Sequence, residues 1–406
     1  MGWRDLCDAV TQAGDMPVGL VLLIPRMSLS YAVAAVAMMA RAIARVIGTS
    51  SSHEVKANLR ILIVTDYMPP QTHGIAIRFR QYINFMRRDG HEVHVFCTDS
   101  VKQTETSFDH PNLPSITNPY NSRNKMAYTA GVKLAWYLSA KQWDLVHVVC
   151  PSNICFAVLP VAAWRRIPIY VSHHVEMEYY IYEYVKMKLF ADFGTLMYWL
   201  NTKLPCFKLA HCNAAPTLKF LNSHLPPSLT GFVRKRIPSG VAAERFKVDS
   251  PEQLLEERRQ LLLKCGIAAD ADVCVLVMVQ RLAPEKGTIK ALEALAQIPP
   301  SAAGQKTLHG RPVHILIAGD GPSRKTLTAY AEAHKVDATF IGNVPNETLP
   351  PLYRAADVFV TCSTSETFGL TVLEALACGT PAVLPHCGVF DELWSECVTV
   401  MPNARC

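Results

Sequence analysis

The chain has 406 residues, of which half are hydrophobic and 18% are charged, and its formal net charge is +6. This composition excludes a disordered chain, and the length favours two domains over one compact core. No dense block of Lys and Arg accompanies the charge, so we expect no nucleic-acid partner and at most a weak preference for anionic ligands or an anionic membrane surface.

The N-terminal segment, residues 1–57, is almost wholly apolar from Pro17 to Ile47. Three interpretations stay open for it. It could be a membrane anchor with a cationic flank, an organelle-targeting segment that is removed, or an extra helix packed on the body. The polar residues 48–56 are typical of a linker.

From residue 58 the pattern changes to short apolar strands that alternate with helices. A buried strand is predicted at 59–65, and Ile75 to Arg88 has helical spacing that ends at Gly90. Further strands are predicted in "HEVHVFCTDS", "WDLVHVVC", "IPIYVSHH" and "AHCNAAP". This alternation predicts a parallel sheet and a first Rossmann-like domain over 58–235.

The second half repeats the scheme over 236–406. Its predicted strands are "VCVLVMVQRL", "VHILIAGDGP", "ATFIGNV", "VFVTCS" and "PAVLPH", with helices in "TIKALEALAQI" and "LPPLYRAAD". The sequence therefore predicts an α/β protein with two doubly wound domains facing a cleft. Ligands of such sheets bind beyond the carboxyl ends of the strands.

Two features typical of anion-binding sites come directly after predicted strands: a pair of cationic residues, and a helix that begins at a glycine. Arg281 and Lys286 stand five apart in "QRLAPEKG", which suits a diphosphate, although an isolated pair of this kind is usually a solvated turn. Gly74 opens a helix directly after the first strand. "AGDGP" lacks the third glycine of a dinucleotide fingerprint, so we interpret it as a turn.

The stretch "SETFGLTVLEALACGTP" begins after a strand and carries two acids eight residues apart, Glu366 and Glu374. Its helix is predicted to end at Gly379. The backbone N–H groups of Gly369, Leu370 and Thr371 lie at the helix start and attract phosphate, and Glu374 could accept two hydrogen bonds from a ribose diol. The structural alternative is a capped helix with acids that favour its dipole.

Two histidines end the strand "YVSHH". Adjacent strand residues point to opposite faces, so only one of His173 and His174 is expected to enter the cleft, and metal binding by both is not expected. Both could instead be packing residues.

Taken together, the glycine loop, the strand-end histidine, R-x4-K, GDGP and E-x7-E with "TFGL" resemble the retaining glycosyltransferases of family 4. The resemblance covers about 58–395 and implies the GT-B arrangement. Within the family, "SHHVEMEYY" and "WDLVHVVCPSN" are similar to sulfoquinovosyltransferases, which move sulfoquinovose from a UDP-sugar to diacylglycerol.

The resemblance also implies roles. Arg281 and Lys286 would bind the donor diphosphate without a metal, and Glu374 would hold the ribose. Glu366 and His173 would contact the transferred sugar. Gly74 would admit the donor phosphate, and the donor-binding loop would run through Phe368, Gly369, Leu370 and Thr371. The catalytic set is thus His173, Arg281, Lys286 and Glu366, with no cofactor beyond the UDP-sugar substrate.

Some residues depart from the family pattern. His73-Gly74 replaces two glycines, Ser239-Gly240-Val241-Ala242 replaces N-G-V-D, and Cys406 follows Glu374 by about thirty residues, where a returning helix is usual. The sequence therefore leaves three functions open. The first is glycosyl transfer to a membrane lipid, in the chloroplast if the lipid is a sulfolipid and otherwise at the cytoplasmic face of a membrane. The second is transfer with another donor or acceptor, such as phosphatidylinositol or a soluble sugar. The third is a catalytically silent, membrane-associated UDP-sugar-binding protein.

Overall fold

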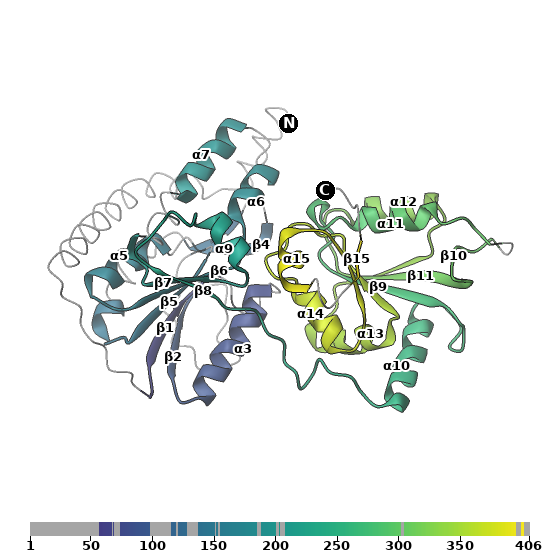
Figure 1. The fold of residues 1–406 in the computed structure, drawn as a ribbon, viewed down its shortest axis with the longest axis horizontal. Helices are drawn as coiled ribbons and strands as arrows, with labels where there is room; N and C mark the ends of the chain where they lie inside the picture. The colour runs from purple at the N-terminus through teal and green to yellow at the C-terminus, as the bar shows by residue number, and fades with distance from the viewer. Residues whose placement is uncertain are drawn as a thin grey trace. The chain divides into compact units, whose positions relative to one another are not determined.

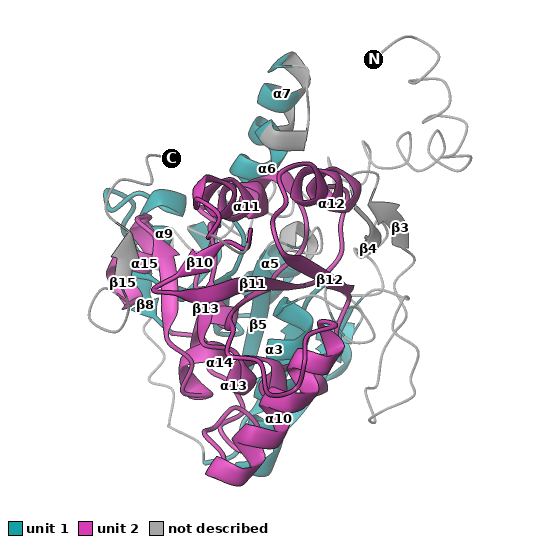
Figure 2. Cartoon of the chain, turned by 90° about the vertical axis from the view of Figure 1, so that its right-hand side faces the viewer, with its two compact units in different colours: residues 1–237 teal, residues 238–406 magenta. Residues whose placement is uncertain are grey.

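The computed structural model divides into two compact units, Met1–Ile237 and Pro238–Cys406 (Figure 2). The domain boundary predicted from the sequence, between residues 235 and 236, lies two residues earlier. The structure describes residues 57–66, 68, 74–97, 115–118, 121–127, 137–150, 152, 155–184, 188–199, 203, 208–301, 304–394 and 399–401. The predicted apolar segment and linker, residues 1–56, lie outside this part of the chain.

The N-terminal unit contains a six-stranded parallel sheet in the order β2-β1-β5-β6-β7-β8 (Figure 1). Its strands are β1 (Arg60–Val64), β2 (Glu92–Phe96), β5 (Leu145–Cys150), β6 (Ile169–His173), β7 (Cys212–Ala215) and β8 (Val233–Arg236). A separate hairpin pairs β3 (Ser115–Asn118) with β4 (Asn121–Ala127). The helices are α3 (Gly74–Arg88), α5 (Cys155–Trp164), α6 (Met177–Tyr184), α7 (Lys188–Tyr198) and α9 (Leu218–His224).

The C-terminal unit has a seven-stranded sheet in the order β10-β11-β9-β13-β14-β15, with β12 on β11. The strands are β9 (Cys274–Val279), β10 (Thr307–Leu308), β11 (Arg311–Ala318), β12 (Ala338–Gly342), β13 (Val358–Val360), β14 (Ala382–Pro385) and β15 (Thr399–Met401). The helices are α10 (Pro251–Lys264), α11 (Thr288–Gln297), α12 (Arg324–Ala333), α13 (Leu349–Ala355), α14 (Leu370–Ala377) and α15 (Gly388–Trp394), with short 3-10 turns η2 (Pro284–Lys286) and η3 (Asn346–Thr348).

The strand β9 shows why these apolar runs fold as central strands. Val275, Val277 and Val279 pack into the core on one face of the sheet, and Leu276 and Met278 pack into the core on the other. A strand covered on both faces buries every side chain, so its sequence is a continuous apolar run. The two sheets, parallel apart from the β10–β11 pair, confirm the predicted α/β architecture.

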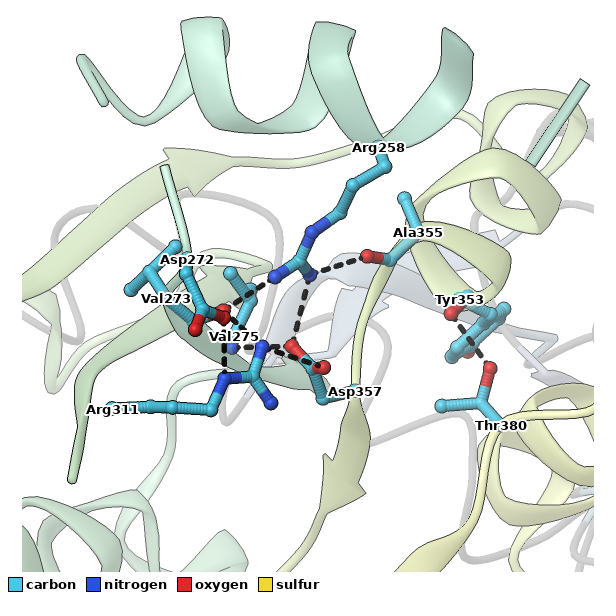
Figure 3. A network of polar contacts seen from close by, with 9 residues as sticks. All are labelled: Arg258, Asp272, Val273, Val275, Arg311, Tyr353, Ala355, Asp357 and Thr380. Carbon is cyan, nitrogen blue, oxygen red and sulfur yellow. Dashed lines mark hydrogen bonds and ion pairs between the residues drawn. The ribbon is translucent and has the colours of Figure 1, made fainter. Parts of the chain in front are cut away.

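A polar network fastens the amino ends of three strands in the C-terminal unit (Figure 3). Asp357 forms ion pairs with Arg258 at 3.0 Å and with Arg311 at 3.5 Å. Its Oδ2 also accepts a 2.7 Å hydrogen bond from the backbone N–H of Val275. Because catalytic groups of such sheets gather beyond the other ends of the strands, we interpret this network as structural.

None of the helices in the described residues is both long and apolar enough to cross a bilayer.

Candidate active site

Three loops converge at the carboxyl edge of the C-terminal sheet, after β9, β11 and β13. Glycine allows this approach: a Cβ on Gly319 would lie 1.9 Å from the carbonyl oxygen of Gln280, and one on Gly321 would lie 2.3 Å from that of Leu282. A Cβ on Gly287 would lie 2.6 Å from the carbonyl oxygen of Cys362. The GDGP turn therefore packs directly on the loop that carries Arg281 and Lys286. This close packing requires glycine at both Gly319 and Gly321.

Lys286 and Glu366, which are eighty residues apart in the sequence, meet at this edge. Nζ of Lys286 lies 2.5 Å from Oε1 of Glu366, and both side chains are mostly buried. Ser363 joins them: its Oγ lies 2.9 Å from the same carboxylate oxygen and 3.5 Å from Nζ. The structure thus brings together the residue predicted to bind the diphosphate and the residue predicted to bind the sugar.

Arg281 lies on the same loop, one residue beyond Gln280, and is partly buried. Gln280 fixes this loop, because its amide donates to the carbonyl oxygen of Lys286 at 3.0 Å and to Oγ1 of Thr288 at 2.8 Å. Two cations on one braced loop can face a diphosphate without the loop having to reorganise.

The predicted helix after "TFG" is α14, and Gly369 precedes it with a φ of 83°. The first backbone N–H groups to bond back into the helix are those of Val372 and Leu373, which both reach the carbonyl oxygen of Gly369. The amides of Leu370 and Thr371 therefore lie in the first turn, where a helix offers N–H groups to an anion.

Phe368 differs from the other residues of this loop, because its side chain is buried in the core against Trp394. Its carbonyl oxygen accepts a hydrogen bond from Nε1 of Trp394 at 3.2 Å. The sequence treated Phe368 as a donor-binding residue, and the structure leaves only its backbone for such a contact.

Glu374 lies within α14 and is buried. Its Oε2 accepts a 2.7 Å hydrogen bond from the hydroxyl of Tyr353, and its Oε1 lies 3.5 Å from Nδ2 of Asn346. Asn346 is itself held by Arg245, which donates to its carbonyl oxygen and to Oδ1. Burial raises the pKa of Glu374 to about 7, against the hydrogen bond from Tyr353, which lowers it.

In the N-terminal unit, Gly74 is exposed at the start of α3, as expected. The two histidines do point to opposite sides. His173 Nε2 lies 2.9 Å from Oδ1 of Asn213 with the ring beside His224, whereas His174 Nδ1 lies 3.1 Å from a guanidinium nitrogen of Arg78. Both rings are buried, and burial lowers the pKa of His173 to about 4. His173 is therefore neutral near pH 7, and its contact with a sugar stays a prediction.

Three residues of this site, Ser363, Tyr353 and Asn346, were not predicted from the sequence. Ser363 had a usable signal, because it follows β13 at the edge where polar residues were already expected. Tyr353 and Asn346 had no such signal. They lie in α13 and in the turn before it, and no local sequence pattern predicts how this segment packs against α14. Among the described residues, no cluster of three His, Cys, Asp or Glu could hold a metal ion.

Two Rossmann-like α/β units, each built on a sheet of mainly parallel strands, form the fold of a GT-B glycosyltransferase. Residues 72–229 match the family described as Glycosyltransferase Family 4, and residues 267–399 match Glycosyl transferases group 1. Together these matches cover more than half of the chain, which belongs to the family 4-like GT-B glycosyltransferases.

Curated relatives include a monoglucosyldiacylglycerol synthase and a sulfoquinovosyl transferase. The chain is 26% identical over 329 residues to an alpha-monoglucosyldiacylglycerol synthase of Streptococcus pneumoniae, which covers 80% of this chain and 70% of the relative. It is 24% identical over 325 residues to the sulfoquinovosyl transferase SQD2 of Arabidopsis thaliana, which covers 80% of this chain and 58% of the relative. The chain thus spans less than two thirds of the length of the Arabidopsis protein.

Solved structures agree on the fold. Anabaena Alr3699/HepE in complex with UDP-glucose superposes with a TM-score of 0.59 at 18% identity, covering 84% of this chain and 85% of that one. WaaG, a glycosyltransferase involved in lipopolysaccharide biosynthesis, superposes with a TM-score of 0.60 at 18% identity, covering 85% and 86%.

Proposed function

We propose that this glycosyltransferase moves a sugar from a UDP-sugar to a membrane lipid with retention of configuration, and that sulfoquinovose and diacylglycerol are its substrates. The observation that carries the proposal is the joining of Lys286 to Glu366 beyond the strand ends of the sheet that also carries Glu374. One cluster then offers a cation for a diphosphate and a carboxylate for sugar hydroxyls.

In the proposed reaction, the residues position the donor and stabilise charge. Arg281 and Lys286 stabilise the diphosphate as the glycosidic bond breaks, and the amides of Leu370 and Thr371 add to this stabilisation. The acceptor hydroxyl attacks from the face that the diphosphate leaves, and the diphosphate takes its proton. Neither Glu366 nor Glu374 transfers a proton in this scheme, and the two cations supply the positive charge that a metal would otherwise supply.

The lipid acceptor is supported by the names of the relatives and by one feature of the N-terminal unit. Helices α6 and α7 expose Tyr179, Tyr182 and Leu196, whose exposed fractions are 37%, 50% and 51%. Aromatic and aliphatic side chains of this kind favour the interface of a bilayer. One of these relatives is named for a glucosyl lipid and the other for a sulfoquinovosyl group, at 26% and 24% identity, so the sugar has to be tested directly.

The test is an assay of the full chain with vesicles that contain diacylglycerol or phosphatidylinositol, with UDP-sulfoquinovose or UDP-glucose as donor and Lys286→Met as control. We expect a sulfoquinovosyl lipid with the anomeric configuration of the donor, formed equally well in the presence of EDTA. Transfer to soluble sugars with no lipid product would overturn the lipid acceptor. A lipid product with UDP-glucose alone would overturn sulfoquinovose.

A further inference from the structure

The N-terminal unit contains a buried cation whose hydrogen-bond partners are all neutral. Arg78 on α3 is 6% exposed. Its guanidinium donates to the hydroxyl of Tyr82 at 3.0 Å, to Nδ1 of His174 at 3.1 Å and to the carbonyl oxygen of Ile237 at 3.4 Å. Within the described residues, no carboxylate forms an ion pair with it.

The histidines around Arg78 cannot carry a compensating charge, because imidazole is either neutral or positive. His147 lies in the same cluster, and burial, followed by the field of Arg78, lowers its pKa to about 3. A buried charge without a counter-ion is costly, and proteins normally pair it. Helix α3 follows β1, so its N-terminal N–H groups lie at the carboxyl edge of the N-terminal sheet. They add positive potential near Arg78.

A directed chain of hydrogen bonds holds the guanidinium in place. Arginine has only N–H donors, so Nδ1 of His174 accepts and its Nε2 carries the proton, which it donates to Oγ of Ser172 at 2.9 Å. Ser172 can in turn donate to Nε2 of His147 at 2.8 Å. These partners fix the plane of the guanidinium, and a fixed fork recognises a tetrahedral oxyanion well.

We propose that Arg78, held by His174, is the centre of an oxyanion-binding site at the carboxyl edge of the N-terminal sheet, and that the oxyanion is a sulfonate or phosphate group of the donor. The assignment of the oxyanion to the donor rests on the proposed function. The sequence motifs did not predict this role for Arg78 or His174. At this helix they named only Gly74 as a residue that contacts an anion.

The site itself is tested without catalysis. The melting temperature of the full chain is measured with methanesulfonate or inorganic phosphate against chloride at equal ionic strength, for the wild type, Arg78→Gln and Arg88→Gln. Arg88 lies in the last turn of the same helix and is 71% exposed, so its variant controls for surface charge. We expect the two oxyanions to raise the melting temperature of the wild type and Arg88→Gln, and to have less than half that effect on Arg78→Gln. An equal increase in all three proteins, or none in any, would overturn the site.

Donor kinetics then identify the source of the oxyanion. Arg78→Lys keeps the charge but not the fork, so we expect KM to rise about tenfold for a donor whose oxyanion binds there. A rise for UDP-sulfoquinovose but not for UDP-glucose assigns the sulfonate, and an equal rise for both assigns the diphosphate. Unchanged KM for both donors would overturn binding of the donor. If the wild type transferred no sugar at all, the proposed function would fail while the melting experiment still decided the site.

Discussion

The hydroxyl of Tyr353 donates a 2.7 Å hydrogen bond to Oε2 of Glu374, and both groups are buried between α13 and α14. The backbone carbonyl of Tyr353 is fixed as well, since it accepts a 2.6 Å hydrogen bond from Oγ1 of Thr380 (Figure 3). Tyr353 therefore holds the carboxylate that is predicted to bind the ribose, and it is a positioning residue for that contact.

Replacing Tyr353 with Phe should raise the KM for the donor about tenfold, because a hydrogen bond to a charged group is worth about 1.5–3 kcal/mol. It should also move the pKa of Glu374 further above 7, because the bond from Tyr353 lowers that pKa. The measurement is KM for the donor between pH 6 and 9. Tyr330→Phe on α12 is a matched control. A parallel increase in KM at every pH would contradict the link to Glu374.

Replacing Glu374 with Gln should weaken donor binding and yet stabilise the fold at alkaline pH. The pKa of Glu374 is raised from 4.5 to about 7 by burial. The folded state therefore keeps a proton that the unfolded state loses, so stability falls as pH rises from about 4.5 to 7 and is flat above that. Removing this charge should recover on the order of 3 kcal/mol at most at pH 8.

The check is urea unfolding of wild type and Glu374→Gln at pH 5 and pH 8. We expect the difference between the two proteins in the free energy of unfolding to appear at pH 8 and to be small at pH 5. A variant less stable than wild type at pH 8 would show that the hydrogen bonds of the carboxylate outweigh its burial.

Lys286 and Glu366 should act as one unit in catalysis. Lys286→Met and Glu366→Gln are each expected to lower kcat/KM by at least a hundredfold, and the double variant should be far less impaired than the product of the two effects. Groups in direct contact couple by about 0.5–3 kcal/mol. The measurement is a double-mutant cycle on kcat/KM, with Arg60 and Glu92, an exposed ion pair at 2.6 Å in the N-terminal unit, as the control pair. Independent effects would mean that the pair does not serve a common step.

His173 tests whether the buried ring takes part in transfer. His173→Gln keeps a side chain that can bond to Asn213, so we expect the free energy of unfolding to change by about 1 kcal/mol. If the ring contacts the sugar near the reacting carbon, kcat should fall about a hundredfold. His334→Gln, an exposed position on the other unit, is the control. Full activity per folded molecule with a lower melting temperature would make His173 a packing residue.

Much of the fold could be predicted from the sequence, because strands and helices each have a characteristic spacing of apolar residues that is visible within a short segment. The strands β1, β9 and β11 identify themselves by continuous apolar runs at 61–64, 274–279 and 315–318, and Gly379 marks the end of α14 with a φ of 83°. The short strand β8 was missed because its sequence VRKR is mostly exposed and charged, which resembles a loop.

The candidate site was less predictable, because contacts across a sheet depend on geometry and not on spacing. The motif pattern named Lys286 and Glu366 but could not show that they pair. It also named Phe368 as a donor-binding residue but could not show that its ring packs in the core. Arg78 was not singled out, since a single arginine in an amphipathic helix does not reveal that it will be buried.

The fastening of Asp357, Arg258 and Arg311 at the amino ends of the strands has a further consequence. The ion pairs that hold the C-terminal sheet lie at the edge opposite to Lys286 and Glu366, with the length of the strands between them. Loops at the carboxyl edge can therefore accumulate substitutions without loosening the sheet. Because of this separation, substitutions in the loops could change the sugar specificity without destabilising the sheet. The loops after β9 and β13 are therefore the place to redesign the donor specificity.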